Sequence, residues 1–348
     1  MIHQCGIVML GHREGNITWD CPPVVNKSST SIKTTQFQMI VQLYFISVFC
    51  LIGLFGNVVS VIVLWKDKER RHALFLLQAL AVADGFYLIM ALLKHPTRHL
   101  IEDLKTYNQM DLYVYPLLKV AETVCIWMMV LVTVDRYMYV CSPLRASKVI
   151  NRHNRHLWAL GVFAIGCLYN LPQFFDSCVM TFVNGCTGDE LKSSKVISPY
   201  FHSTLYFDIY MYTAFICLMY IVPLVTLCVL NARLVMTIRR SRIRQRQYGG
   251  HTDHNDMNAT LVLVILVVVF IVCETPELIL RILSCLERWF ASISFSVSLF
   301  RVFSTVNEFL MVVNSSINFF IYVAYGKRFR FIMKETFKYG LLNSTASL

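Results

Sequence analysis

Seven apolar runs dominate this sequence, and each is long enough to cross a lipid bilayer as a helix, which takes about 20 residues. Only helices and closed barrels satisfy every backbone polar group inside lipid, and none of the runs is polar enough to require barrel strands. We therefore predict an all-α, seven-transmembrane helical bundle over residues 39–325. The runs cover residues 39–65, 73–93, 112–140, 156–172, 206–233, 259–284 and 298–325.

The distribution of charge predicts how the bundle is oriented. Only 15% of the 348 residues are charged, and the formal charge is +11. The bases gather in the loops on one side, with further examples after the seventh run: Lys66, Lys68, Arg70, Arg71, Arg145, Lys148, Arg152, Arg155, Arg239, Arg240 and Lys327. The positive-inside rule makes that side cytoplasmic. This location explains the charge without a nucleic-acid partner, and an odd number of spans puts the N-terminus outside.

The two ends of the chain fit this orientation. Residues 1–38 are polar and contain two glycosylation sequons, at Asn16 and Asn26, which predict an extracellular tail. Residues 326–348 follow the last span on the cytoplasmic side. Apolar residues recur there at helical spacing, with bases on the opposite face, which predicts a short amphipathic helix on the membrane surface. These apolar residues are Phe329, Ile332, Met333 and Phe337.

Polar residues inside the spans are costly and need a reason. Asp135-Arg136-Tyr137 closes the third run, although a charge at a helix centre costs about 2.5–3.5 kcal/mol. Arg136 either snorkels to the headgroups or serves a cytoplasmic partner. Five further residues suggest a functional cluster or a structural set of hydrogen bonds worth about 0.6 kcal/mol each. They are Asn57, Asp84, Asn314, Ser315 and Asn318.

Two of the runs contain a proline, Pro223 in the fifth and Pro276 in the sixth. Each proline removes a helix hydrogen bond and permits a kink. With these motifs in this order, the chain resembles a rhodopsin-like G-protein-coupled receptor across essentially its whole length. The motifs are Asn57, Leu80–Asp84, Asp135-Arg136-Tyr137, Trp158, Pro223, Cys273-x-x-Pro276 and Asn318-x-x-x-Tyr322.

Finer details resemble the invertebrate FMRFamide-type neuropeptide receptors. They are Val140–Ala146, Tyr169-Asn-Leu-Pro-Gln-Phe-Phe175, Leu230-Asn-x-Arg233, Cys273-x-Thr-Pro-Glu277 and Asn314–Tyr322. The resemblance implies a multi-pass plasma-membrane receptor for an extracellular neuropeptide ending in Arg-Phe-amide. Its partners would be that peptide, a heterotrimeric G protein and membrane lipids, and it would not be an enzyme.

The chain departs from the family pattern at several positions. Phe319 replaces the proline usual after Asn318, Glu274 replaces a tryptophan, and Asn231 replaces a tyrosine. The cysteine usual at the outer end of the third span is absent, and Asp111 stands about there. Cys178 and Cys186 therefore pair with each other, pair with Cys5 or Cys21, or stay free. The outside is oxidising, so we expect some pairing, but sequence does not give the connectivity.

Other functional classes fit the residues less well. Retinal needs a Schiff-base lysine, and the seventh span has none between Arg301 and Lys327. Amine receptors carry an aspartate where this chain has Leu118, and no inverted repeat indicates a transporter. Twelve dispersed cysteines without a Cys-x-x-Cys pair argue against a metal site. The alternative that remains is a proton- or ion-responsive protein built on the intramembrane acids.

The resemblance also implies switch residues. Arg136 would contact the G protein, with Asp135, Tyr137, Pro276, Asn318 and Tyr322 in supporting roles. Asp256 lies about 30 Å below Pro276 along a helix, level with Arg136, and is expected either to latch that arginine or to cap a helix starting near Met257. The cluster around Asp84 matches the family's sodium pocket. Because Cys125 replaces a serine there, we expect no cofactor beyond weakly bound sodium.

Acids in the outer halves of the spans predict a ligand pocket. They are Glu122, Glu274, Glu277 and Glu308. One alternative is local pairing, of Lys119 with Glu122 and of Glu277 with Arg281, which leaves Glu274 and Glu308 unmatched. The other is that Glu308, Glu277 or Glu274 receives the arginine of the ligand, with Glu308 the leading candidate.

Overall fold

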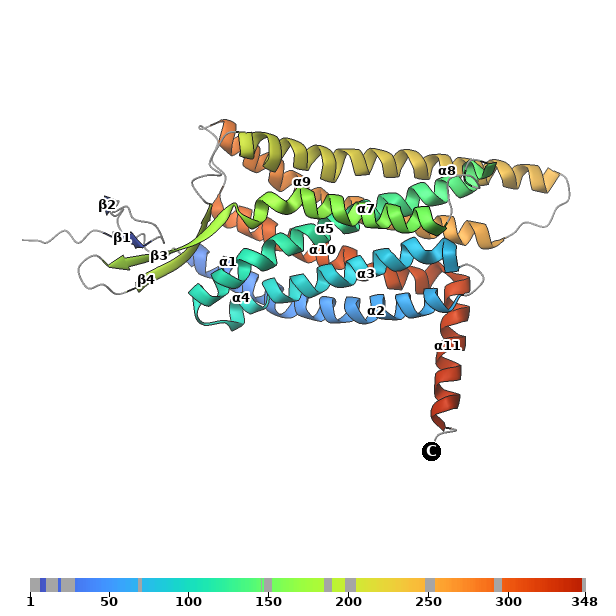
Figure 1. Cartoon of the computed structure of the whole chain (residues 1–348), viewed down its shortest axis with the longest axis horizontal. Coiled ribbons are helices and arrows are strands. Elements are labelled where there is room, and N and C mark those ends of the chain that lie inside the picture. The colour runs from blue at the N-terminus through green and yellow to red at the C-terminus, as the bar shows by residue number, and fades with distance from the viewer. Residues whose placement is uncertain are drawn as a thin grey trace, which may run out of the picture.

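A computed structural model of the chain shows a long bundle of helices lying side by side (Figure 1). It describes residues 7–10, 18–19, 29–67, 71–144, 146, 152–184, 190–197, 205–247, 254–290 and 296–345. One end of the bundle carries a β-hairpin, formed by β3 (Ser177–Asn184) and β4 (Glu190–Ile197), and is called the hairpin end. The final helix, α11 (Lys327–Thr345), leaves the opposite end, which is called the α11 end.

The helices contain all seven predicted apolar runs and extend beyond them. They are α1 (Ser29–Met39), η1 (Ile40–Phe45), α2 (Ile46–Lys66), α3 (Arg71–Lys94), α4 (Thr97–Leu100), α5 (Leu104–Cys141), α7 (Arg152–Asn170), η2 (Leu171–Phe174), η4 (Leu205–Ala214), η5 (Ile216–Ile221), α8 (Val222–Gln247), α9 (His254–Trp289) and α10 (Val297–Tyr325). Helix α1 begins at Ser29, so the first helix starts ten residues before the predicted boundary at 39.

Capping explains one of these extensions. Asp103 precedes α5, and its carboxylate accepts hydrogen bonds from the backbone N–H groups of Lys105 and Thr106 at 3.0 and 3.2 Å. These groups belong to the first turn, whose donors have no partner within the helix. Hydrogen bonds to the carboxylate, above all from the hydroxyl of Thr106, also lower the pKa of Asp103. The helix therefore starts at a polar signal outside the apolar run.

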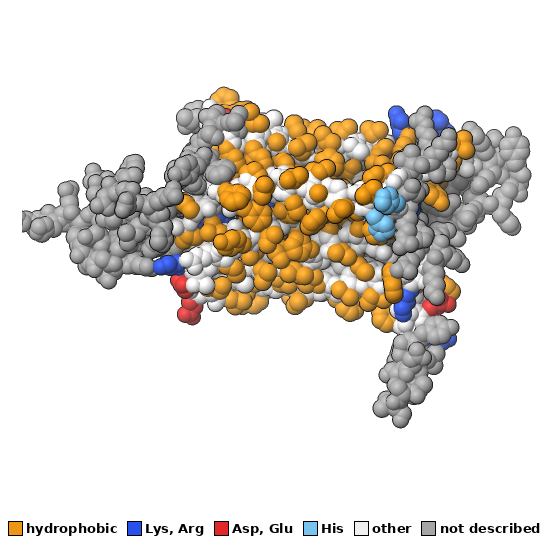
Figure 2. Space-filling view, in the orientation of Figure 1, with side chains coloured by type: hydrophobic (Ala, Val, Ile, Leu, Met, Phe, Trp, Pro, Cys, Tyr) orange, Lys and Arg blue, Asp and Glu red, His pale blue; other side chains and the backbone are white. Residues whose placement is uncertain are grey.

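The surface of the bundle matches a membrane protein. Hydrophobic side chains cover its middle, and charged side chains lie toward its two ends (Figure 2). By length and composition, six helical stretches among the described residues can cross a membrane. The remaining long helix, α9, carries Glu274, Glu277 and Arg281 within its apolar stretch.

Helix α5 lies at the centre of the bundle. Of its most apolar stretch 72% is buried, against 17–44% for the other five spans. Small residues let other helices approach closely. A Cβ at Gly53 of α2 would lie 2.2 Å from Ser316 Oγ of α10, and one at Gly56 would lie 2.8 Å from Phe319 Cβ. These two glycines bring α2 and α10 together beside the polar residues of both helices.

A four-stranded antiparallel sheet at the hairpin end was not predicted. Its order is β2-β1-β3-β4, so β1 (Ile7–Leu10) and β2 (Thr18–Trp19) add the N-terminal segment to the hairpin. Within it Cys178 lies opposite Val196 and carries a free thiol, whose pKa is raised by burial. Cys5, Cys21, Cys186 and both sequon residues, Asn16 and Asn26, lie outside the described residues.

Helix α11 turns sharply away from the bundle (Figure 1). The ring of Phe329 packs against Tyr322 of α10, with centroids 5.6 Å apart. Arg328 forms two hydrogen bonds of 2.7 Å with the buried carboxylate of Asp67, which follows α2. An apolar face and an ion pair thus fix the start of the amphipathic helix, which continues past the predicted Phe337 to Thr345.

Candidate functional site

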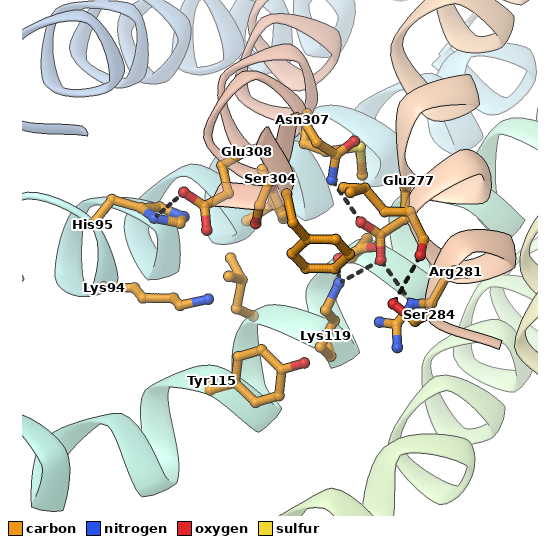
Figure 3. A pocket seen from close by; sticks show the side chains of 16 residues that line it. Lys94, His95, Tyr115, Lys119, Glu277, Arg281, Ser284, Ser304, Asn307 and Glu308 are labelled. Carbon is orange, nitrogen blue, oxygen red and sulfur yellow. Dashed lines mark hydrogen bonds and ion pairs between the residues drawn. The ribbon is translucent and has the colours of Figure 1, made fainter. Parts of the chain in front are cut away.

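A cavity of about 230 Å³ lies between α3, α5, α9 and α10, toward the hairpin end (Figure 3). Charged side chains of both signs line it: Lys94, Lys119, Glu122, Glu277, Arg281 and Glu308. The wall of the cavity also includes His95, Tyr115 and Phe300. Two of the three proposed acceptors of a ligand arginine, Glu308 and Glu277, therefore face one space.

Glu277 is the centre of a buried network. Its Oε1 lies 3.0 Å from Arg281 Nε and 3.7 Å from Lys119 Nζ, and its Oε2 accepts a 2.6 Å hydrogen bond from Asn307 Nδ2. Lys119 also pairs with Glu122 at 2.8 Å. Both local pairs foreseen from spacing therefore form. The contacts of Lys119 and Asn307 extend them into a link across α5, α9 and α10, which compensates charges that would otherwise be costly to bury.

Glu308 is not unmatched, so that expectation was wrong. Its Oε2 accepts a 2.7 Å hydrogen bond from Gln42 Nε2 of η1 and lies 3.4 Å from His95 Nδ1. Gln42 in turn contacts His99 Nε2 at 2.8 Å. These partners lie on other helices, so residue spacing along α10 could not reveal them. The side chain of Glu308 stays 23% exposed, and it points toward His95 at the cavity wall (Figure 3).

Glu274 differs from the other acids. It is 4% exposed and does not line the cavity. Its Oε1 has no hydrogen-bond partner among the residues that the structure describes. Glu274 stands where the resemblance implied a tryptophan. It places a buried carboxyl group within α9, two residues before Pro276.

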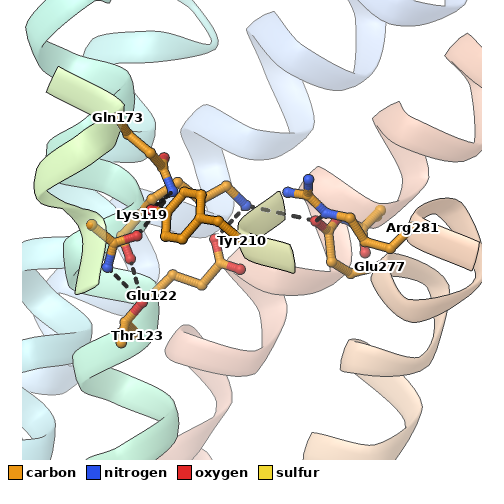
Figure 4. A network of polar contacts seen from close by, with 9 residues as sticks. Lys119, Glu122, Thr123, Gln173, Tyr210, Glu277 and Arg281 are labelled. Carbon is orange, nitrogen blue, oxygen red and sulfur yellow. Dashed lines mark hydrogen bonds and ion pairs between the residues drawn. The ribbon is translucent and has the colours of Figure 1, made fainter. Parts of the chain in front are cut away.

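A second set of polar contacts ties α7 to its neighbours (Figure 4). Asn170 Nδ2 donates to Thr123 Oγ1 of α5 at 2.9 Å. Gln173 Nε2 donates to Asn170 Oδ1 at 3.1 Å and to the hydroxyl of Tyr210 in η4 at 3.3 Å. Asn170 and Gln173 belong to the segment that resembled the FMRFamide-type receptors. That segment thus connects the fourth and fifth spans to α5, one helical turn from Lys119.

The intramembrane polar residues contact one another across three helices. Asn318 Nδ2 donates to Asp84 Oδ2 at 2.6 Å, and Asn57 Nδ2 donates to the backbone oxygen of Ser315 at 3.0 Å. Asn314 is buried, and its Oδ1 has no partner among the described residues. Among all the residues that the structure describes, no group of three or more His, Cys, Asp or Glu side chains could hold a metal ion.

At the α11 end, Asp135 has a partner that sequence reasoning missed. Its Oδ1 lies 2.8 Å from Arg155 Nε of α7, and the two side chains are 3% and 6% exposed. Arg136, Tyr137 and Tyr322 belong to the same end of the bundle. Helix α9 begins at His254, so Asp256 lies inside its first turn and not ahead of a helix starting near Met257. The side chain of Asp256 lies outside the described residues.

The hairpin is held to α5 by charge. Lys195 Nζ of β4 lies 2.9 Å from Asp111 Oδ2 and donates to the backbone oxygen of Asp111 at 3.2 Å. Lys195 Nζ also lies 4.7 Å from the ring centroid of Tyr115, which lines the cavity. An ion pair thus occupies the position where the resemblance implied a cysteine. Through Tyr115, this ion pair also connects the hairpin to the wall of the cavity.

Comparison with known proteins agrees with this architecture. Residues 56–322 match the family described as 7 transmembrane receptor (rhodopsin family). The FMRFamide receptor of Drosophila melanogaster is 25% identical over 82% of this chain and 51% of its own length. The sex peptide receptor of the same organism is 25% identical over 62% of this chain and 52% of its own. The chain therefore spans about half the length of both relatives.

A relative from Caenorhabditis elegans, the FMRFamide peptide receptor frpr-18, is 23% identical over 83% of this chain and 68% of its own length. The matched region runs from α2 to the end of α10 and includes the cavity, the polar cluster around Asp84 and the Asp135–Arg155 pair. On this match and on the helical bundle that it covers, the chain is a multi-pass membrane protein that belongs to the rhodopsin family of seven-transmembrane receptors.

Proposed function

We propose that this protein is a plasma-membrane receptor for a neuropeptide and signals through a heterotrimeric G protein. The hairpin end would face the outside and the α11 end the cytoplasm, in accord with the basic loops. The observation that carries the proposal is the cavity itself, a charged space beneath the hairpin in a bundle of the receptor family. Relatives named for FMRFamide support a peptide ligand.

The ligand would end in Arg-Phe-amide, with its guanidinium on Glu308. Glu277 already has two cations and an amide around its carboxylate, so it is the poorer acceptor. Glu308 contacts an imidazole and an amide, and neither carries a permanent charge. The ligand's phenyl ring would pack on Tyr115 or Phe300 of the cavity wall. Two other aromatic residues, Phe207 and Phe303, do not line the cavity.

Glu308→Gln tests the arginine site. The variant should weaken Phe-Met-Arg-Phe-amide by about ten- to a hundredfold, because a charge-assisted hydrogen bond is lost. The same peptide with citrulline in place of arginine has no charge to lose, so its affinity should change by less than about threefold. The measurement is displacement of a labelled peptide from membranes of expressing cells.

The exposed residue Glu102 offers a matched control, since Glu102→Gln removes the same charge near the hairpin end but outside the cavity. It should leave both peptides unaffected. Equal weakening of both peptides by Glu308→Gln would mean that Glu308 is structural. A response of the wild type to acid alone, without any peptide, would instead favour the alternative of a proton- or ion-responsive protein.

The other end of the bundle would serve the G protein. Arg136 would contact it there, with Asp135, Tyr137 and Tyr322 as neighbours in the switch. The cluster of Asp84 and Asn318 would transmit the change between the two ends, with at most weak sodium binding. Asp256, in the first turn of α9, would restrain Arg136 in the resting state.

A further inference from the structure

The acids and bases of the cavity do not all have charged partners. Glu122 is paired with Lys119, and Glu277 with Lys119 and Arg281. Glu308, by contrast, has no permanently charged partner within 4.0 Å among the described residues. The cavity therefore has one carboxylate whose contact partners carry no permanent charge, and one of its bases likewise contacts no described carboxylate.

Lys94 is that base. It is the last residue of α3, and its ammonium group points into the cavity between His95 and Tyr115 (Figure 3). Lys94 Nζ lies 4.6 Å from the ring centroid of Tyr115, a cation–π contact. Within the part of the chain that the structure describes, no carboxylate comes within ion-pair distance of Lys94.

The same aromatic ring has a second cation. Lys195 Nζ lies 4.7 Å from the Tyr115 centroid, so the ring is shared by an ammonium group from α3 and one from the hairpin. Lys195 has Asp111 as its counter-ion. Lys94 contacts the ring, and Glu277 and Glu308 attract it only from beyond ion-pair distance, which leaves room for an anionic partner in direct contact.

We propose that Lys94 and Tyr115 form a second subsite of the cavity, which takes a carboxylate of the same peptide whose arginine Glu308 receives. The ligand would therefore carry an acidic side chain close to its Arg-Phe-amide end. This inference rests on the proposed function, because it assumes a peptide in this cavity. It adds a requirement that a neutral or purely cationic peptide does not meet.

The charged side chains that line the cavity support this subsite. Lys94 and Glu308 both line the cavity, on adjoining walls formed by α3 and α10, and they attract each other without coming within the 4.0 Å of an ion pair. A ligand that brings a guanidinium alone would compensate Glu308 and leave Lys94 facing a net positive space. A ligand with both charges compensates both residues, and it displaces water from each without leaving a charge unmatched.

The experiment uses two pairs of peptides that all end in Arg-Phe-amide. One pair is Asp-Phe-Met-Arg-Phe-amide and its Asn counterpart, and the other is Phe-Asp-Arg-Phe-amide and its Asn counterpart. Affinities are measured on the full-length receptor in cell membranes. In at least one pair, the Asp peptide should bind about tenfold more tightly than the Asn peptide, the effect of about 1.4 kcal/mol.

Lys94→Gln should abolish that preference by weakening the Asp peptide alone, and Lys94→Arg should preserve it. Lys105→Gln, which removes a lysine near the same end of the bundle but outside the cavity, should change neither peptide. Cell-surface expression identifies any variant that fails to fold. If Lys94→Gln does not reach the surface, the charge-conserving Lys94→Arg still tests the subsite, because it should keep the preference for Asp.

The outcomes separate the two proposals. Binding of the peptides without any preference for Asp, or equal losses for Asp and Asn peptides in Lys94→Gln, would overturn the carboxylate subsite and leave the peptide receptor intact. If no peptide ending in Arg-Phe-amide binds the wild type, the proposed ligand class fails, and the subsite fails with it.

Discussion

Asp135 shows how much a single buried residue depends on its partner. Its carboxylate is 3% exposed, and Arg155 lies within 2.8 Å of it. Removing one member of a buried ion pair leaves the other as an uncompensated charge, which typically costs about 3–5 kcal/mol, whereas replacing both can be neutral. The loss of both charges, of Asp135 and of Arg155, should therefore destabilise the protein far less than the loss of the Arg155 charge alone.

The prediction at this scale is a double-mutant comparison. Arg155→Met should lower the free energy of unfolding of the purified receptor by about 3 kcal/mol or more, and Asp135→Asn combined with Arg155→Met should restore most of it. Thermal unfolding of the detergent-solubilised protein measures the difference. Arg239→Met serves as control, because Arg239 is exposed. A double variant no more stable than Arg155→Met would contradict the assignment.

What sequence could foresee depended on the distance between partners. The pairs Lys119–Glu122 and Glu277–Arg281 were predictable, because residues three or four apart share one helix face. Glu308–Gln42 and Asp135–Arg155 join different helices, so no local spacing encodes them. Most charges of the cavity could be named from sequence, but Lys94 and the partners of Glu308 had to be seen in three dimensions.

At the scale of elements, the hairpin is the part that sequence predicted least well. The seven helices follow from long apolar runs, whereas β3 is a short segment of mixed polarity, β4 is largely polar, and neither shows a clear alternation. Both strands contact α5, and β4 forms an ion pair with it, between Lys195 and Asp111. Because Tyr115 contacts the same lysine, loosening the hairpin should also disturb the cavity wall.

A charge exchange tests this ion pair. Asp111→Ala should weaken peptide binding by about three- to tenfold, because the hairpin loses its ionic contact with the helix. Exchanging the charges, with Asp111→Lys and Lys195→Asp together, should restore part of the affinity. If the double variant does not outperform Asp111→Ala, the pair does not position the hairpin.

At the scale of the whole molecule, the chain joins a charged cavity at one end to a basic surface at the other. The polar contacts of Asp84 with Asn318 and of Asn57 with Ser315 lie between them and bind three different helices together. The charges of the loops predict the orientation of this assembly, and its family follows from the motifs along the chain. Fold and family were therefore accessible from sequence, because both rest on features repeated over the whole length.

Arg136→Ala tests the connection between the two ends. The variant should reach the cell surface and bind Phe-Met-Arg-Phe-amide within about threefold of the wild type, because the cavity is distant. Its G-protein activation should nevertheless be abolished, since a permanently charged guanidinium would be missing from the G-protein contact. The readout is nucleotide exchange on co-expressed G proteins. Normal exchange would refute the role of Arg136.

The ion pair between Lys195 and Asp111 has a consequence for the fluids in which the hairpin keeps its position. Its two side chains are only 21% and 12% exposed, and their charged atoms lie 2.9 Å apart. That distance is far shorter than the screening length of about 8 Å at physiological ionic strength, and partly buried pairs are screened much less than exposed ones. The hairpin should therefore keep its place beside the cavity wall in dilute and in saline body fluid alike.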